Sequence, residues 1–285
     1  MQSRFAAERF LARITQSDYK NEMVLKGGYL IGAMVGLGNR STHDLDYSYQ
    51  KKVPVDQLQR IVTEVAQIDL KDGTHFNNIS VDENANATER YNPGYRVSMD
   101  LEMANPDPSK PNKPVTYHLG IDLATNDDII PNVQRFNHTS EIDGSKISVY
   151  AYPVEQILAE KMSACFNHGD QDTRVRDFYD LYALKRFEGE SIDNDSLRAS
   201  IKNQLKIHNQ YDALENPIAA FNDLRQSLRL QKVWNDKRQQ IIPEGQEITF
   251  DQTINAANNL LRNAGFKDTA PRPKHRPWLS QERPR

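Results

Sequence analysis

Residues 24–46 read VLKGGYLIGAMVGLGNRSTHDLD, and they combine a glycine pair with two aspartates. Gly27 and Gly28 fall where a short strand is expected to turn into a helix. Asp44 and Asp46 are one residue apart in the next expected strand, so their side chains project from the same face of it. Neighbouring carboxylates repel each other unless a cation compensates them, and for hard oxygen ligands that cation is Mg²⁺ or Mn²⁺.

The glycine pair predicts a site for an anion. Glycine has no Cβ, so Gly27 and Gly28 let backbone N–H groups approach an anion at the start of the following helix, where the dipole favours negative charge. Arg40 and Thr42 add a cation and a hydroxyl group just before the aspartates. A phosphate site beside a metal-binding carboxylate pair is typical of phosphoryl or nucleotidyl transfer. Ordinary surface strands and turns also contain Asp-x-Asp and paired glycines, so neither motif by itself is specific for this chemistry.

The composition describes a globular protein without a dominant charge. The 285 residues carry a net charge of −3 and the pI is about 6.2, so any basic surface for a nucleic acid must be local. Cys165 is the single cysteine, which excludes an internal disulfide. No apolar run approaches the ~20 residues that cross a bilayer, and the N-terminus lacks a signal-peptide core. We therefore expect a cytoplasmic protein.

Hydrophobic periodicity predicts an α+β fold, a mixed sheet with flanking helices followed by a helical domain. Helices are expected at 3–15, 30–36 and 55–68, strands at 24–25, 43–49, 95–103 and 116–124, and a loop at 125–145. From Pro153 onward the apolar residues follow a helical period, so we place a domain boundary near residue 150. The expected domains are an α/β core at 1–150, a helical domain at 151–266 that completes the site, and a basic, proline-rich, disordered tail at 267–285.

A third carboxylate is expected on the same sheet. The strand at 116–124 alternates apolar residues with His118, Gly120 and Asp122. Asp122 therefore lies on a polar face, where it can approach the aspartate pair. It is a candidate metal ligand or a candidate base for an acceptor hydroxyl.

The helical part carries a second group of charged residues, at 153–184. Lys161 is a long cation on a helix that is otherwise apolar on its inward side, and as a point charge it can reach a phosphate. The alternative is a solvated lysine that pairs with Glu160. Asp177 and Asp180 follow in the next helix, where a structural ion-pair network explains them as well as catalysis does.

Three motifs in this order resemble one known family. They are the LKGG turn at 25–28, the Arg-x-Thr-x-Asp-Leu-Asp run at 40–46, and AEKMSA followed by RDFYDLYAL within 159–184. Together they resemble the AbiEii/AbiGii nucleotidyltransferase toxins, within the DNA-polymerase-β-like nucleotidyltransferase superfamily. The resemblance covers roughly residues 20–185. The family usually has Ser or Thr after the glycine pair, where this chain has Tyr29, so a hydroxyl contact to a phosphate from this position is not implied.

The resemblance implies roles for both groups of residues. The implied catalytic residues are Asp44, Asp46, Lys161, Asp177 and Asp180. The implied ligands of Mg²⁺ or Mn²⁺ are Asp44, Asp46 and, less closely, Asp122. The implied nucleotide-binding residues are Lys26, Gly27, Gly28, Tyr29 and Arg40.

The same resemblance implies the reaction and its partners. An NTP would donate its nucleoside monophosphate to a nucleic acid acceptor, the 3′ end of a tRNA, with release of pyrophosphate. Family systems encode an antitoxin separately, and the antitoxin does not have to bind the toxin. A basic stretch at 225–238 is a candidate RNA contact, although charge runs usually lie on solvated surface.

Three alternatives remain open at this point. The first is a small-molecule nucleotidyltransferase of the aminoglycoside-modifying kind. The second is a non-catalytic nucleotide-binding module, for which Tyr29 is the one indication. The third is a metal-dependent phosphohydrolase, which the scattered histidines His43, His118 and His168 disfavour.

Overall fold

The computed structural model of the chain describes residues 2–36, 45–83, 94–107, 109–110, 113–140, 143–168 and 175–268. Arg40, Asp44 and the tail beyond residue 268 lie outside the described residues. The chain divides into two units. Unit 1 consists of Met1–Leu30, Thr42–Asp128 and Val133–Tyr152, and unit 2 of Ile31–Ser41, Ile129–Asn132 and Pro153–Arg285.

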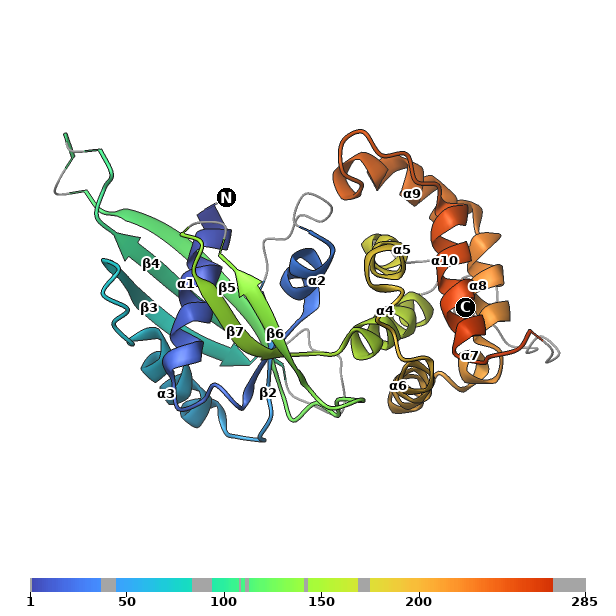
Figure 1. Cartoon of the computed structure of the whole chain (residues 1–285), viewed down its shortest axis with the longest axis horizontal. Coiled ribbons are helices and arrows are strands. Elements are labelled where there is room, and N and C mark those ends of the chain that lie inside the picture. The colour runs from blue at the N-terminus through green and yellow to red at the C-terminus, as the bar shows by residue number, and fades with distance from the viewer. Residues whose placement is uncertain are drawn as a thin grey trace. The chain divides into compact units, whose positions relative to one another are not determined.

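Unit 1 holds a mixed sheet of seven strands in the order β3-β4-β5-β2-β1-β7-β6 (Figure 1). The strands are β1 (Met23–Lys26), β2 (Leu45–Tyr49), β3 (Thr74–Glu83), β4 (Gly94–Met103), β5 (Val115–Thr125), β6 (Gln134–Thr139) and β7 (Lys146–Ala151). β2 pairs in parallel with β5, and β1 with β7, whereas the other neighbours are antiparallel. The α+β fold with a mixed sheet is therefore confirmed.

The first and the third helix of the chain pack on this sheet. The first three helices of the chain are α1 (Gln2–Gln16), α2 (Gly27–Val35) and α3 (Val55–Ala66). Phe10 of α1 is buried, and its ring packs edge-on against Tyr47 of β2 and Phe76 of β3. Because side chains alternate along a strand, the polar residues of β2, β4 and β5 project from the other face. The helices predicted at 3–15 and 55–68 are confirmed.

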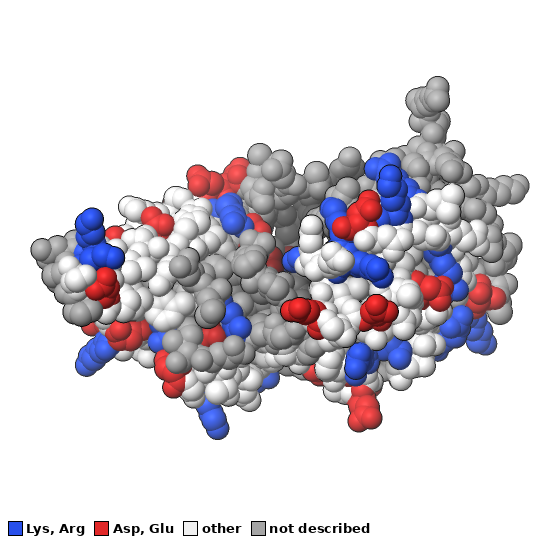
Figure 2. All heavy atoms as spheres, turned by 90° about the horizontal axis from the view of Figure 1, so that it is seen from above, with Lys and Arg blue, Asp and Glu red and all other residues white. Residues whose placement is uncertain are grey.

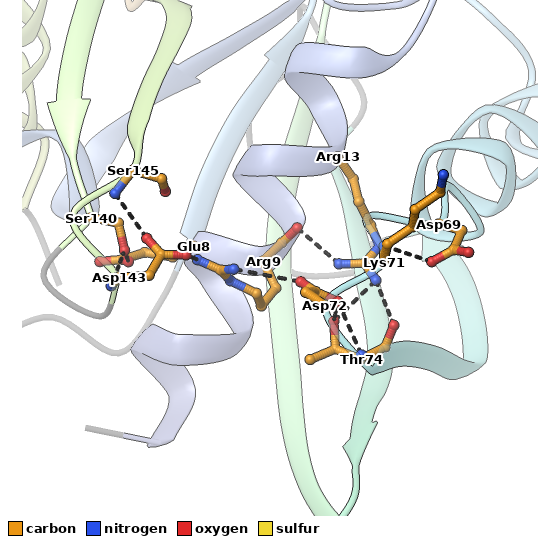
Figure 3. A network of polar contacts seen from close by, with 10 residues as sticks. All are labelled: Glu8, Arg9, Arg13, Asp69, Lys71, Asp72, Thr74, Ser140, Asp143 and Ser145. Atoms are coloured by element: carbon orange, nitrogen blue, oxygen red, sulfur yellow. Dashed lines mark hydrogen bonds and ion pairs between the residues drawn. The ribbon is translucent and has the colours of Figure 1, made fainter.

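A polar network fastens α1 to the rest of unit 1 (Figure 3). Arg13 is buried and donates hydrogen bonds to the carbonyl oxygen of Thr74 at 2.8 Å and to its hydroxyl at 3.1 Å. Arg9 forms ion pairs with Asp72 at 3.4 Å and with Asp143 at 2.9 Å. A buried guanidinium needs partners of this kind. The network therefore fixes α1 over the start of β3 and the turn before β7.

Three strands were not predicted. β3 breaks the alternation that marks a strand, because its pairing with β4 shifts register between Asn77 and Ser80. β6 lies at the other edge of the sheet and carries a single large apolar residue, Phe136. The prediction of a loop throughout 125–145 is wrong for β6, and the short β7 that follows it was not singled out.

Unit 2 is helical. Its remaining helices are α4 (Val154–His168), α5 (Arg176–Glu188), α6 (Asn194–Ile207), α7 (Tyr211–Glu215), α8 (Pro217–Arg225), α9 (Leu228–Ile241) and α10 (Phe250–Asn263). Aromatic side chains from several helices meet in its core, namely Phe166, Phe178, Phe221, Trp234 and Phe250. Among the described residues, none of the helices combines the length and the apolarity that a bilayer crossing requires.

Candidate active site

The glycine turn and the second aspartate are in direct contact. β1 ends at Lys26 and α2 begins at Gly27, whose φ is +64°. A Cβ on Gly27 would lie 2.0 Å from Oδ2 of Asp46. The backbone N–H of Gly28 donates a hydrogen bond to the same oxygen at 3.1 Å. The anion at the start of α2 is thus the carboxylate of Asp46, held where a helix N-terminus favours negative charge.

Charged residues form one row across five strands of the sheet. We call it the charged row, and it consists of Asp82 (β3), Arg96 (β4), Asp122 (β5), Asp46 (β2) and Lys26 (β1). Each member is paired directly with the next in the register, so all five project from the same face. Two adjacent carboxylates lie in the middle, with a cation on either side. This order offsets the repulsion that two like charges on neighbouring strands would cause.

At one end of the charged row, Lys26 belongs to a small network. Its ammonium lies 2.9 Å from Oδ2 of Asp127, which also accepts a hydrogen bond from the hydroxyl of Tyr152. Burial alone would raise the pKa of Asp127, but the charge of Lys26 and hydrogen bonds from Lys26, Tyr152 and Ser48 outweigh it and lower this pKa. Asp127 is therefore ionised and holds Lys26 beside Asp46.

Asp122 has a cation of its own. Nη1 of Arg96 lies 2.9 Å from Oδ1 of Asp122, and both side chains are partly exposed. The ion pair spans the gap between β4 and β5, where the two residues face each other. Asp122 is thus adjacent to Asp46 in the sheet and already compensated from its other side.

The carboxylates of Asp46 and Asp122 fit a divalent cation in the chemistry of their oxygen donors. They lie on neighbouring strands and on one face, as ligands of a shared ion must. Within the described parts of the chain, however, no cluster of three or more His, Cys, Asp or Glu residues is arranged to hold a metal. Asp44, the remaining predicted ligand, falls in the stretch 37–44 that is outside the described residues.

Tyr29 points away from the glycine turn. The residue is 2% exposed, its ring packs edge-on against His138, and its hydroxyl lies 3.5 Å from Nε2 of that histidine. The same nitrogen lies 3.4 Å from the buried carboxylate of Glu8. Tyr29 therefore secures the first turn of α2 to the core, and its hydroxyl is engaged with His138.

The second predicted group comes together in unit 2. The ammonium of Lys161 (α4) lies 2.6 Å from Oδ1 of Asp177 and 3.1 Å from Oδ2 of Asp180, both on α5. The side chain of Lys161 is 19% exposed and that of Asp180 is fully buried. Glu160, the alternative partner of Lys161, accepts a hydrogen bond from Gln156. Lys161 is therefore held between two carboxylates.

Comparison with known proteins decides the family. The model of a family described as nucleotidyl transferase AbiEii toxins of type IV toxin–antitoxin systems matches residues 9–256. The chain belongs to the AbiEii family. It is accordingly a nucleotidyltransferase toxin of a type IV toxin–antitoxin system, and a nucleoside triphosphate is its expected substrate.

Solved structures share the fold of this AbiEii toxin, and MenT4 is one of them. The nucleotidyltransferase toxin MenT4 of Mycobacterium tuberculosis superposes with a TM-score of 0.52, over 94% of this chain and 84% of MenT4. The two sequences are 15% identical, so the similarity concerns the fold. A search among curated proteins found no match.

The structure of this AbiEii toxin adds site residues that the sequence did not single out. Asp127 and Tyr152 hold Lys26, and Arg96 pairs with Asp122. No motif marks them, because they reach the site through strand pairing and through the turn after β5, where Asn126 has a φ of +56°. The one signal for Arg96 is the alternation of apolar and polar residues within 95–103, which puts Arg96 on the polar side of that strand.

Proposed function

We propose that this AbiEii toxin is a Mg²⁺-dependent enzyme that transfers a nucleoside monophosphate from an NTP to the 3′ end of a tRNA in the cytoplasm and releases pyrophosphate. The observation that carries this proposal is the carboxylate of Asp46, oriented by the N–H of Gly28 with Asp122 on the next strand. Two oriented carboxylates beside a helix N-terminus suit metal-assisted transfer of a phosphorus group.

The residues of unit 1 would share the work as follows. Asp46, together with Asp44, would hold the metal, and Asp122 would be a third ligand or accept the proton of the acceptor hydroxyl. A bound divalent metal polarises the α-phosphate and neutralises charge on the leaving pyrophosphate. Lys26 would add positive charge beside the β- and γ-phosphates. Gly27 and Gly28 would bring backbone N–H groups near a nucleotide phosphate, which would compete there with the carboxylate of Asp46, the acceptor of the Gly28 N–H.

Lys161, Asp177 and Asp180 form a triad in unit 2, and this triad would contribute a fixed cation. Its two carboxylates restrain the ammonium of Lys161, so that a phosphate contact would require little further ordering of a long side chain. Asp177 and Asp180 would act through Lys161 as positioning residues. Arg40 would place a further positive charge beside the nucleotide phosphates.

The RNA acceptor would meet a local basic surface rather than a broad one. On the face shown in Figure 2, basic and acidic side chains are interspersed. Within the basic stretch, Arg225 pairs with Asp251, whereas Arg229, Lys232 and Arg238 of α9 are exposed. We place the phosphate contacts of the acceptor on these α9 residues. The antitoxin, encoded separately, would counteract the toxin without having to bind it.

Labelled nucleotides test the reaction. The protein is incubated with total RNA, Mg²⁺ and each NTP in turn, labelled at the α- or the γ-phosphate. We expect α-label in RNA and γ-label in pyrophosphate, with both products lost on addition of EDTA. Label in a small molecule would favour the small-molecule transferase. NTP binding without transfer to any acceptor would favour the non-catalytic module.

A further inference from the structure

Arg96 is exposed more than a structural ion pair requires. Its side chain is 40% exposed. Among the described residues it forms an ion pair with Asp122, whose side chain is 45% exposed. Ion pairs this open to solvent contribute about 0–1 kcal/mol to folding. The guanidinium has five N–H donors, and the contact with Asp122 involves Nη1. Fold stability therefore does not account for an arginine at this point of the charged row.

The guanidinium of Arg96 lies over Gly120 of the neighbouring strand β5, where there is no Cβ. A Cβ on Gly120 of β5 would lie 2.1 Å from Nη2 of Arg96 and 2.8 Å from Cζ. The φ of Gly120 is outside the left-handed region, so its backbone does not require glycine. A glycine inside a strand weakens the strand and often marks a point where another group approaches closely. Here the approaching group is the guanidinium of Arg96.

We propose that Arg96 binds a phosphate group of a substrate held at Asp46 and Asp122. Its strand is next to that of Asp122 and two strands from that of Asp46, so the backbones are about 5 Å and 10 Å apart. A guanidinium binds phosphate oxygens in a bidentate manner, which a point charge such as lysine cannot do. The phosphate belongs either to the NTP or to the acceptor RNA. This inference rests on the proposed function.

The competing explanation is that Arg96 only compensates the charge of Asp122. The two explanations differ in the double variant. If Arg96 only neutralises Asp122, then Arg96→Gln has no effect in a background that already carries Asp122→Asn. If Arg96 binds phosphate, the substitution Arg96→Gln weakens substrate affinity in the Asp122→Asn background as well.

The experiment uses the full chain. Three single variants are compared with wild type, and the double variant Asp122→Asn/Arg96→Gln is compared with Asp122→Asn by its Kd for an NTP and its Kd for RNA. Arg96→Gln removes the cation. Gly120→Ala keeps it but displaces it, and the fold tolerates this because the displaced atoms end a flexible side chain. The control is Arg60→Gln, whose side chain on α3 is 71% exposed and paired with Asp56. The readouts are the Kd for an NTP with Mg²⁺ in the absence of RNA, and KM and kcat for RNA in the transfer reaction.

We expect Arg96→Gln and Gly120→Ala to raise one of the two affinity constants about tenfold, the size of one charge-assisted phosphate contact, while Arg60→Gln leaves both unchanged. A raised NTP Kd assigns the phosphate to the nucleotide, and a raised KM for RNA alone assigns it to the acceptor. Constants within twofold of wild type in both arms would overturn the inference, and so would an Arg96→Gln effect that vanishes with Asp122→Asn.

The proposed function fails in a different way, because it fails in the wild type. If the wild-type protein transfers no label, the transfer reaction is wrong, and the NTP-binding arm still tests Arg96. If wild type transfers label and Arg96→Gln matches it in both constants, only the inference about Arg96 is wrong. If wild type neither binds NTP nor transfers label, both are wrong.

Discussion

Gly27 meets two separate demands at one residue. Its backbone lies in the left-handed region, with a φ of +64°, and the place of its missing Cβ is taken by the carboxylate of Asp46. Gly73 meets the first demand without the second, since its φ is +72° and nothing lies within 4 Å of a Cβ built there. A comparison of Gly27 with Gly73 therefore separates the cost of a left-handed backbone from the cost of disturbing Asp46.

Gly27→Ala is therefore expected to cost more than Gly73→Ala. Alanine in the left-handed region costs about 1–2 kcal/mol, which is the expected loss for Gly73→Ala. Gly27→Ala should lose at least about 1 kcal/mol more, because the overlap with its carboxylate forces Asp46 to move. It should also lose nucleotidyl transfer, while Gly73→Ala keeps it. Urea denaturation and the label-transfer assay check both statements, and equal losses of stability would show that the contact with Asp46 is unimportant.

Asp127 gives the stability of unit 1 a specific dependence on pH. Its pKa in the folded protein lies below the usual value of about 3.9. The resulting stabilisation is complete above about pH 4 and is lost as the pH falls through the folded pKa. Asp127→Asn should therefore lower the free energy of unfolding by about 1–3 kcal/mol at pH 7, and the difference from wild type should shrink below pH 4. A difference that stays constant down to pH 3 would contradict this ion pair.

At the level of helices and strands, the sequence predicts what a simple period encodes. α3 buries Leu58, Ile61 and Val65 on one side, and in the sequence these apolar residues recur with the helical period of 3.6. β3 could not be found in this way, because the register shift after Asn77 interrupts its alternation. β6 escaped prediction because an edge strand needs few apolar residues.

The position of α1 depends on Arg13. We expect Arg13→Met to lower the free energy of unfolding by about 2–4 kcal/mol, because the buried acceptors of Thr74 lose their donor and the helix loses its tie to β3. The matched Arg60→Met on α3 should stay within about 0.5 kcal/mol of wild type, since that side chain is 71% exposed. Denaturation in urea measures both, and similar values for the two variants would refute the anchoring role.

The triad between α4 and α5 separates stability from activity. Lys161→Met removes the cation that lies 3.1 Å from the buried carboxylate of Asp180, which should cost about 3–5 kcal/mol. Adding Asp180→Asn removes that charge and should restore at least half of the loss. Transfer activity should stay absent in the double variant, because the phosphate contact is still missing. A double variant that regains activity would show that Lys161 is purely structural.

In the whole molecule, the sequence predicts the residues proposed for the reaction to different degrees. Gly27 and Asp46 stand close together in the sequence, and Lys161 and Asp180 belong to adjacent helices, so motif and spacing reveal both groups. The row that joins Asp46 to Asp122 depends on which strands are neighbours, and β2 lies beside β5 although β3 and β4 come between them in sequence. Strand order is set by packing, which the pattern of single segments does not encode.

The role of Asp46 is the claim on which the account depends most. The decisive measurement is the rate at which α-labelled NTP modifies RNA, compared among wild type, Asp46→Asn and the control Asp56→Asn, an exposed carboxylate on α3. We predict that Asp46→Asn lowers the rate at least about a hundredfold, the usual effect of removing one group that stabilises charge in the transition state, while it remains folded and Asp56→Asn matches wild type. A folded Asp46→Asn protein that modifies RNA at the wild-type rate would contradict the account.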